Sequence, residues 1–398
     1  MIRTSKHKFT KPNKNKYEKL NLFINQYKQA TQYFVDYIWN NLIDQNLNSP
    51  NMISTKGHVI GDLSQRAIKC SATQACGIIK GVLDLKRRRI YVLSQLDMNS
   101  KEYNKLKELI DNQKISKPNI NGNCELNSIC FDIKDNHIQL KSIGKFFGKI
   151  RLPFKFHKGS KKWSKKGKML NSILLNEKGI DLRWEIENKL KSEGNIVGLD
   201  QGKITLISLS DGQTTKPNKH NHDLNTILER LSRKKKGSKG FKREQDHRKN
   251  YINWSINQLN LKNIKQINFE DIKNVRKGKT NSRIMSHWTY ALIKSKVERL
   301  CEELGVQVKY NSSPYRSQRC NRCGLVLKSN RNKKVFCCKG CGYVEDSDIN
   351  ASKNHEQDLP FISFKSNVLN NLEGFYWRLD GLFDINGKEI TVPYANKT

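Results

Sequence analysis

The sequence predicts a multidomain α+β protein, and three observations carry this prediction. The chain has 398 residues, which is more than one ordinary hydrophobic core supports, so two or more domains are expected. Apolar residues recur at helical spacing over residues 17–96, whereas short alternating runs separated by Asn and Gly follow over residues 119–187. Apolar strands that end in acidic residues begin again after Gly194. We therefore place domain boundaries near residue 120 and near residue 194.

The expected elements follow from these patterns. The first ten residues alternate loosely and predict an edge strand, and apolar stripes predict helices over residues 17–46 and 62–96. The β-like runs predict an open β-barrel module, with strands at residues 128–133, 138–140, 149–153 and 172–175. The lysine-rich segment 157–168 is expected to be a basic loop of this module.

The charge balance points to a polyanionic partner. Lys and Arg number 74 against 37 acidic residues, which leaves a formal net charge of +37. Phosphates are the obvious counter-charge, because neutralising them releases condensed cations. Charge alone does not separate an enzyme from a packaging protein. The candidate nucleic-acid contacts are Lys86, Arg87, Arg88 and Arg89, for which a solvated helix end is the alternative, together with Lys161, Lys162, Arg233, Lys234, Lys235 and Lys236.

A membrane partner is disfavoured. No run approaches the ~20 apolar residues of a membrane span, and the basic N-terminus has no apolar signal-peptide core behind it. We expect a soluble protein of the cytoplasm. In that reducing compartment the ten cysteines are more consistent with metal binding than with a disulfide framework.

Three acidic residues occur where a nuclease would place its metal ligands. Asp200 and Glu270 each end a short apolar strand, seventy residues apart, and Asp348 leads into a short helix. Each has a structural alternative as a turn or helix cap. Two Mg²⁺ ions ~3.5–4 Å apart can neutralise the transition state of phosphodiester hydrolysis and activate water. Hard Mg²⁺ prefers carboxylate oxygen, so three converging carboxylates suit such a pair.

A second metal site is predicted by four cysteines. Cys320 and Cys323 form one CxxC pair, and Cys338 and Cys341 form another after fourteen intervening residues. Two such turns suit tetrahedral zinc, and four protein ligands leave no open position for water, so the zinc would be structural. Cys337 makes the register ambiguous, but only Cys338 preserves the CxxC spacing.

These motifs together resemble a known family, the TnpB RNA-guided nucleases (transposon-associated OrfB) and the related miniature type V CRISPR effector nucleases. Residues 286–324 resemble the family's SxW helix, GVxV strand and "YTSQxCxxCG" segment, which leads into its zinc ribbon. Residues 198–202, 269–272 and 348–354 resemble its first, second and third RuvC motifs. Gln201, Arg316 and Ser352 depart from the usual residues, but no acid is missing.

The resemblance implies a domain plan. A β-barrel wedge domain would comprise residues 1–15 and 119–193, with a helical recognition lobe, residues 16–118, inserted in it. An RNase H-like RuvC domain would comprise residues 194–316 and 342–357, with a zinc ribbon inserted at 317–341. The match is strong over residues 195–355, and the tail 358–398 has no assigned role.

The resemblance also implies a function. A guide RNA would pair with double-stranded target DNA beside a short duplex motif that the protein recognises. Asp200, Glu270 and Asp348 would bind two Mg²⁺ and cut DNA, first the displaced strand, while Arg316 and Arg319 lie near phosphates. The protein would act as a monomer or homodimer on each guide. The alternatives are an RNA-guided repressor without nuclease activity, an RNA-independent RNase H-like transposase, and a non-catalytic zinc-ribbon binder.

Overall fold

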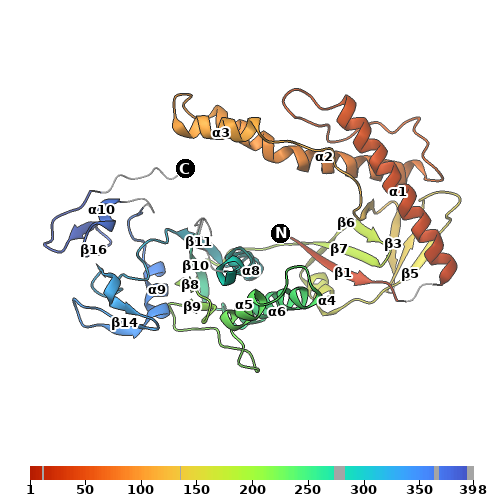
Figure 1. Cartoon of the computed structure of the whole chain (residues 1–398). Helices are drawn as coiled ribbons and strands as arrows, with labels where there is room; N and C mark the ends of the chain where they lie inside the picture. The colour runs from red at the N-terminus through yellow and green to blue at the C-terminus, as the bar shows by residue number, and fades with distance from the viewer. Residues whose placement is uncertain (11–12, 135, 273–282, 363–366, 392–398) are drawn as a thin grey trace. The chain divides into compact units, whose positions relative to one another are not determined.

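The computed structural model describes residues 1–10, 13–134, 136–272, 283–362 and 367–391. This part of the chain is a mixed α+β structure with several separate sheets, as predicted, and it divides into two compact units, Met1–Glu187 and Asn188–Thr398 (Figure 1). Residues 363–366 and 392–398 of the predicted tail lie outside the described residues. None of the described helices is long and apolar enough to cross a membrane.

The first unit contains two antiparallel sheets. One has the strand order β1-β7-β6-β2 and the other β3-β4-β5. Among the described strands, the N-terminal strand β1 pairs only with β7, which comes more than 170 residues later, so the chain start is an edge strand as predicted. The strands are β1 (Ile2–Lys8), β2 (Cys124–Asn127), β3 (Phe131–Lys134), β4 (His137–Leu140), β5 (Ile150–Pro153), β6 (Gly167–Asn176) and β7 (Gly179–Ile186).

Four helices complete this unit: α1 (Lys14–Asn41), α2 (Gln65–Ser94), α3 (Lys101–Asp111) and α4 (Lys158–Lys166). Asn13 caps α1 and Ser64 caps α2, each by accepting a backbone N–H of the first turn. The apolar stripes of α1 and α2 pack into one core with the sheet residues. The predicted basic loop at 157–168 is wrong: it is mostly helix α4, because the His157 ring accepts the N–H groups of Gly159 and Ser160 and so starts a helical turn.

The second unit is built on a mixed sheet with the order β11-β10-β8-β9, in which β11, β10 and β8 are parallel and β9 is antiparallel. These strands are β8 (Asn195–Gln201), β9 (Ile207–Leu209), β10 (Ile264–Glu270) and β11 (Gln307–Asn311). One apolar face of the sheet shares a core with helices α5 (Leu224–Ser232), α6 (Lys239–Ile256) and α8 (Tyr290–Leu304).

The turn between α8 and β11 requires glycine. Gly305 caps α8 with a left-handed φ of 71°, and a Cβ there would lie 2.4 Å from the carbonyl oxygen of Lys189. The remaining elements of the unit are α7 (Arg283–Ser286), β12 (Leu325–Val326), the 3₁₀ turn η1 (Lys328–Asn330), β13 (Arg331–Asn332), β14 (Val335–Cys337), β15 (Val344–Asp346), α9 (Ser347–Glu356), α10 (Asn367–Asn370), β16 (Phe375–Trp377) and β17 (Leu382–Asp384).

The C-terminal tail belongs structurally to the cysteine region. Strand β12, which follows the first CxxC pair, is hydrogen-bonded to β16, and β16 pairs with β17. The Trp377 amide donates to the carbonyl of Gly324, and the Trp377 side chain is fully buried in a small core. The tail therefore supplies two strands and an aromatic core to this region.

Candidate functional site

Asp200 and Glu270 are placed side by side by the register of two parallel strands. Leu199 of β8 lies opposite Phe269 of β10. The residues that follow them, Asp200 and Glu270, therefore come next to each other across the two strands. Both acids therefore lie at the carboxyl ends of adjacent parallel strands, where open α/β sheets place their ligands. Because side chains alternate along a strand, Leu199 and Phe269 point into the core that the sheet shares with α5, α6 and α8. The two acids point to the opposite face of the sheet.

Helix α9 covers that opposite face, and Gly198 lets it come close. A Cβ at Gly198 would lie 1.9 Å from the carbonyl oxygen of Ser352, so only glycine permits this approach. Gly198 and Asp200 share a strand face because they are two residues apart. The same close packing that excludes a side chain at Gly198 thus brings α9 against Asp200.

Two asparagines of the sheet hold the C-terminal end of α9. The Asn268 amide donates to the carbonyl of Glu356 at 3.1 Å, and the Asn311 amide donates to the carbonyl of His355 at 2.7 Å. Both asparagines are buried. They satisfy carbonyls at the helix end that have no partner within the helix, and they fix its position across β10 and β11.

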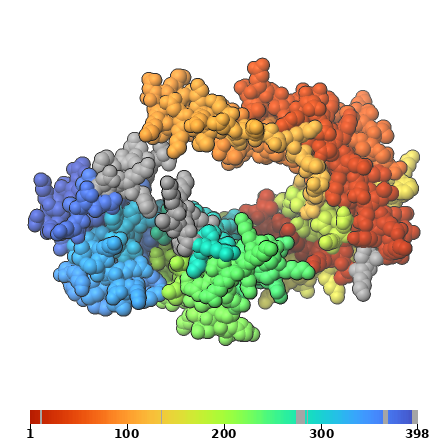
Figure 2. Space-filling view, in the orientation of Figure 1, coloured from red at the N-terminus to blue at the C-terminus, as the bar shows by residue number. Residues whose placement is uncertain are grey.

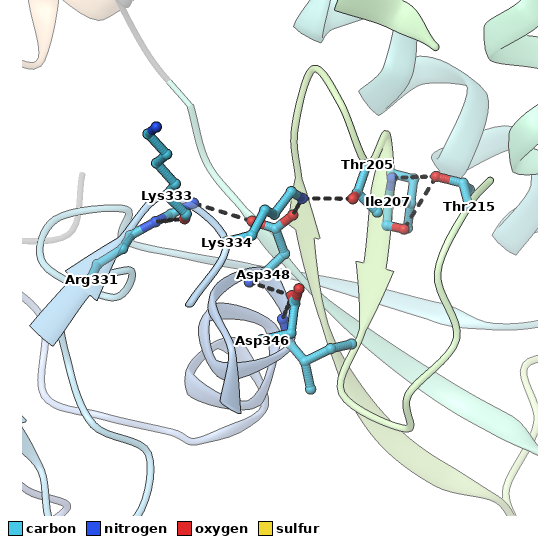
Figure 3. A network of polar contacts seen from close by, with 9 residues as sticks. Thr205, Ile207, Thr215, Arg331, Lys333, Lys334, Asp346 and Asp348 are labelled. Atoms are coloured by element: carbon cyan, nitrogen blue, oxygen red, sulfur yellow. Dashed lines mark hydrogen bonds and ion pairs between the residues drawn. The ribbon is translucent and has the colours of Figure 1, made fainter. Parts of the chain in front are cut away.

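Asp348 lies in the first turn of α9. Asp346 is the N-cap, since its carboxylate accepts the amide hydrogens of Asp348 and Ile349, and this leaves the Asp348 side chain available for other contacts. That side chain is buried and forms ion pairs with Arg331, at 3.1 Å, and with Lys334. Figure 3 shows Lys334 between Asp348 and Thr205, to which its ammonium group also donates.

The closest set of potential metal ligands near these strands includes a residue that the sequence interpretation missed. An oxygen of Asp200, an oxygen of Glu270 and a ring nitrogen of His355 all lie within 4.8 Å of one another. His355 follows Asp348 by seven residues, which is two helical turns, and so lies on the same face of α9. This spacing from Asp348 was the only signal for His355 in the sequence. His355 itself lies one residue beyond the third motif, residues 348–354.

The site is electrostatically strained without a cation. Burial, followed by the charges of Glu270 and Asp348, raises the pKa of Asp200 well above its usual value. Burial raises the pKa of Glu270 from 4.5 to about 7, partly offset by a hydrogen bond from Ser313. Burial, aided by the charge of Arg316, lowers the pKa of His355 well below 6.5, so its imidazole is neutral. Clustered carboxylates and a neutral imidazole are suitable ligands for a divalent cation, and a bound cation would relieve the repulsion between the carboxylates.

All three predicted acids line one cleft of about 310 Å³. Gln201, Trp288, Ser313, Ser317 and Arg331 are also in its wall. The cleft has room for hydrated cations and a short piece of a linear substrate. The structure thus brings Asp200, Glu270 and Asp348 together, with the first two close and the third held by basic side chains.

The four predicted cysteines also come together. Ligand atoms of Cys320, Cys323, Cys338 and Cys341 lie within 4.8 Å of one another, and Cys337 is not part of the cluster. Two of the sulfur–sulfur distances are 3.7 Å, between Cys320 and Cys341, and 3.5 Å, between Cys323 and Cys338. A tetrahedral zinc with Zn–S bonds of ~2.3 Å requires sulfurs about 3.8 Å apart. The residues present therefore fit a structural zinc.

Arg316 and Arg319 were expected to lie near phosphates, and the structure corrects this. Both side chains are buried, at 2% and 4% exposure. Arg316 donates to the carbonyls of Ser312 and Asn354, and Arg319 donates to the carbonyl of Trp377 and to the Asn354 side chain. Their guanidinium groups join α9 to the cysteine region and the tail, which leaves neither free for nucleic acid.

The two asparagines of the third motif have a similar role. The Asn350 amide donates to the carbonyl of Arg319 at 2.8 Å, and the Asn354 amide donates to the carbonyls of Arg319 and Arg316 at 2.7 and 3.0 Å. Both side chains are fully buried. They hold α9 against the segment that leads into the first CxxC pair, so the motif couples Asp348 to the cysteine cluster.

The side chains of the other candidate nucleic-acid contacts differ in their exposure to solvent. Arg233, Lys234, Lys235 and Lys236 form the exposed turn between α5 and α6, the helices in the green part of the surface in Figure 2. Lys86 and Arg89 are half-buried on α2, where Arg87 and Arg88 pair with Asp84 and Arg89 donates to Gln113. Lys161 and Lys162 are exposed on α4.

One family model matches part of the second unit. Residues 290–355, which contain the cysteines, Asp348 and His355, match the family model described as "Cas12f1-like, TNB domain". The resemblance to the TnpB nucleases and the miniature type V CRISPR effectors is thereby confirmed. The residues matched by the family model lie in the second unit of the chain.

Individual relatives cover parts of the chain. A CRISPR-associated endodeoxyribonuclease Cas12f1 of Sulfoacidibacillus thermotolerans is 32% identical over 115 residues, or 29% of this chain and 26% of the relative. A putative RNA-guided DNA endonuclease InsQ of Escherichia coli (strain K12) is 28% identical over 209 residues, or 44% of this chain and 52% of the relative. The aligned regions thus span between a quarter and a half of these relatives. A solved Cas12f1–sgRNA–target DNA complex aligns with a TM-score of 0.46 at 16% identity, covering 86% of this chain and 82% of that chain.

Proposed function

We propose that this protein is an RNA-guided DNA endonuclease whose active site is formed by Asp200, Glu270 and Asp348. One observation carries the proposal. Two acids at the ends of adjacent parallel strands and a third in the first turn of a helix line the same cleft. Parts of the chain are similar to proteins named as DNA endonucleases.

The domain plan of the proposal follows the family. The mixed sheet β11-β10-β8-β9 with helices on both faces would be the RuvC domain of the RNase H-like type, and residues 317–341 would be its zinc ribbon. The sheet β1-β7-β6-β2, which joins residues 2–8 to residues 124–186, would belong to the wedge domain, and helices α1 to α3 would form the recognition lobe.

The proposed metals are two Mg²⁺ ions at the acids and one zinc at the cysteines. Bound Mg²⁺ would supply charge neutralisation at the phosphate and activation of water. Asp200 and Glu270 are already close enough to share a cation. Asp348 would have to exchange its contacts with Arg331 and Lys334 for a metal contact, and those two side chains would then be free to meet phosphate oxygens at the cleft.

The proposed partners are a guide RNA and a double-stranded DNA target with its displaced strand. The excess of 37 positive charges and the exposed basic turn 233–236 support binding to two polyanions at once. Base pairing with the guide would read the sequence, while the protein would contact mainly the backbone. The protein would act in the prokaryotic cytoplasm, as a monomer or a homodimer on each guide.

The test begins with the protein purified from cells that carry its native locus, followed by sequencing of any RNA that co-purifies. A discrete RNA with a constant scaffold and a variable end defines the target for a cleavage assay with Mg²⁺. Asp200→Ala should reduce cleavage by at least about a thousand-fold, because a lost metal ligand removes several kcal/mol of transition-state stabilisation. It should leave RNA-dependent DNA binding intact.

The control is Asp211→Asn, which changes an exposed carboxylate in a turn of the same unit and should cut normally. Cleavage that survives in Asp200→Ala would refute the active-site assignment. Mg²⁺-dependent cutting by RNA-free protein would favour an RNA-independent transposase. RNA-dependent binding without any cutting by the unaltered protein would favour a repressor.

A further inference from the structure

His355 occupies an unusual place for a histidine that has no assigned role. Its side chain is 1% exposed, and its Nδ1 atom has no hydrogen-bond partner among the residues that the structure describes. Burying a polar atom without a partner is unfavourable, so such an atom points to a missing interaction. Water or an ion can satisfy it, and the neighbouring groups decide which.

The neighbouring groups are the carboxylates of the cleft. A ring nitrogen of His355 and one oxygen each of Asp200 and Glu270 lie within 4.8 Å of one another. Three donor atoms bound to one cation at about 2.1 Å lie roughly 3–4 Å apart, so small side-chain movements close this set on an ion. Asp348 is not part of the set, because its carboxylate is engaged by Arg331 and Lys334.

The backbone that carries His355 is held firmly. The Asn311 amide donates to the His355 carbonyl, and the Asn268 amide donates to the carbonyl of the next residue. The close contact of α9 with Gly198 also fixes the helix on the face of the sheet. A ligand on such a rigid support is preorganised for binding.

We propose that His355 is a direct ligand of the cation bound by Asp200 and Glu270, and that the site therefore favours a first-row transition ion such as Mn²⁺ over Mg²⁺. The assignment rests on the metal site of the proposed function and adds a nitrogen donor to it. Imidazole is a softer ligand than carboxylate or water, and it binds transition ions better than the hard Mg²⁺. An all-oxygen site would show a weaker preference.

The experiment measures Mn²⁺ binding to the zinc-loaded full-length protein without RNA or DNA, so it does not depend on cleavage. Electron spin-echo envelope modulation detects a nitrogen bound directly to Mn²⁺. We expect nitrogen modulation from the unaltered protein, and its conversion to the ¹⁵N pattern when the protein is made with ¹⁵N-histidine. This labelling requires no mutation, so the result does not depend on a variant that folds.

Two variants then assign the nitrogen. His355→Gln should lose the modulation and bind Mn²⁺ on the order of tenfold more weakly, with a smaller loss for Mg²⁺. His222→Gln, which changes a histidine near His220 and His247 in the same unit, should keep both properties. Circular dichroism should show that both variants are folded.

The outcomes separate this inference from the proposed function. Mn²⁺ that binds, is lost in Asp200→Ala and shows no histidine nitrogen would overturn the role of His355 and leave the carboxylate site standing. Nitrogen modulation that persists in His355→Gln would also overturn it. If Mn²⁺ binding does not depend on Asp200, both the ligand assignment and the proposed metal site are overturned.

Discussion

A guanidinium nitrogen of Arg331 lies 3.1 Å from a carboxylate oxygen of Asp348, and Lys334 contacts the other oxygen of the same carboxylate. The two basic residues come from the β13–β14 hairpin, next to the cysteine cluster, and the acid comes from α9. They neutralise the one predicted metal ligand that lies outside the cluster of Asp200, Glu270 and His355. The hairpin therefore competes with cations for Asp348.

This competition predicts that removing Lys334 strengthens metal binding. In Lys334→Met, Asp348 loses one competing cation and the cleft becomes more negative. The Lys334 side chain is 39% exposed, so water weakens the pair to about 1 kcal/mol or less. We expect Mg²⁺ or Mn²⁺ to bind roughly two- to fivefold more tightly in isothermal titration calorimetry.

Lys333→Met is the matched control, because Lys333 is the exposed neighbour of Lys334. Its described contact with Arg331 is made by its backbone carbonyl, which the substitution retains. It should leave metal affinity unchanged. Equal or weaker metal binding in Lys334→Met would show that Lys334 does not compete for Asp348.

The raised pKa of Glu270 predicts a loss of stability as pH rises in Mg²⁺-free buffer. Burial raises this pKa from 4.5 to about 7, so the folded protein holds the proton more tightly than the unfolded chain does. The stabilisation is complete below pH 4.5 and is lost as pH rises through 7, a change of about 3 kcal/mol in the free energy of unfolding. About 2 kcal/mol of it falls between pH 5.5 and pH 8.

Glu270→Gln isolates this contribution, since glutamine does not titrate. Urea unfolding at the two pH values, with zinc retained, should show a pH dependence that is weaker in the variant by about 2 kcal/mol. Saturating Mg²⁺ should restore stability to the unaltered protein at pH 8. Parallel pH profiles for the two proteins would contradict the raised pKa.

The cysteine cluster predicts about one tightly bound zinc per chain. Cys338→Ser should lose the zinc and lower the melting temperature, because the metal holds together two turns that share only a small apolar core. Metal analysis of the purified protein and thermal unfolding measure the two effects.

Cys337→Ser provides a close control, since this neighbouring cysteine lies outside the cluster. It should retain zinc and melt as the unaltered protein does. Loss of zinc in Cys337→Ser with retention in Cys338→Ser would mean that the ligand register is shifted by one residue.

The buried position of Arg319 predicts a loss of stability and no specific loss of nucleic-acid binding. Arg319→Met would leave the Trp377 carbonyl and the Asn354 side-chain oxygen without their donor. We expect a decrease of about 2–3 kcal/mol in the free energy of unfolding, measured by urea denaturation. Burial lowers the pKa of this guanidinium to about 10, so it stays charged and paired at neutral pH.

Arg322→Met is the comparison, because Arg322 is an exposed arginine in the same cysteine turn. It should leave stability unchanged. If Arg319→Met is as stable as the unaltered protein but loses nucleic-acid binding, the phosphate-contact interpretation is right after all.

Local patterns in the sequence were enough to find the candidate site residues. Asp200 and Glu270 were found because each follows an apolar strand, and the structure places both at strand ends. The CxxC spacing selected Cys338 over Cys337, and only Cys338 joins the cluster. Such signals are readable because strand alternation and turn geometry are properties of a few consecutive residues.

Interpretations that depended on distant contacts were less successful. The family resemblance implied that Arg316 and Arg319 lie near phosphates, but both are buried and donate to residues of α9, the tail and the preceding loop. The segment 157–168 looked like a loop because of its lysines, yet the His157 ring caps a helix there. Distant partners decided the position of the two arginines, whereas the helix at 158–166 starts at a local cap that the lysine content obscured.

The sequence by itself determined the α+β class, the strands that end in acids, the cysteine pairs and the excess of positive charge. Only the tertiary structure decided that His355 joins Asp200 and Glu270, that Arg331 and Lys334 hold Asp348, and that the tail supports the cysteine region. The first arises where α9 meets β8 at Gly198, the second where α9 meets the β13–β14 hairpin, and the third where β16 pairs with β12. They depend on the packing of elements far apart in the chain, which no local periodicity encodes.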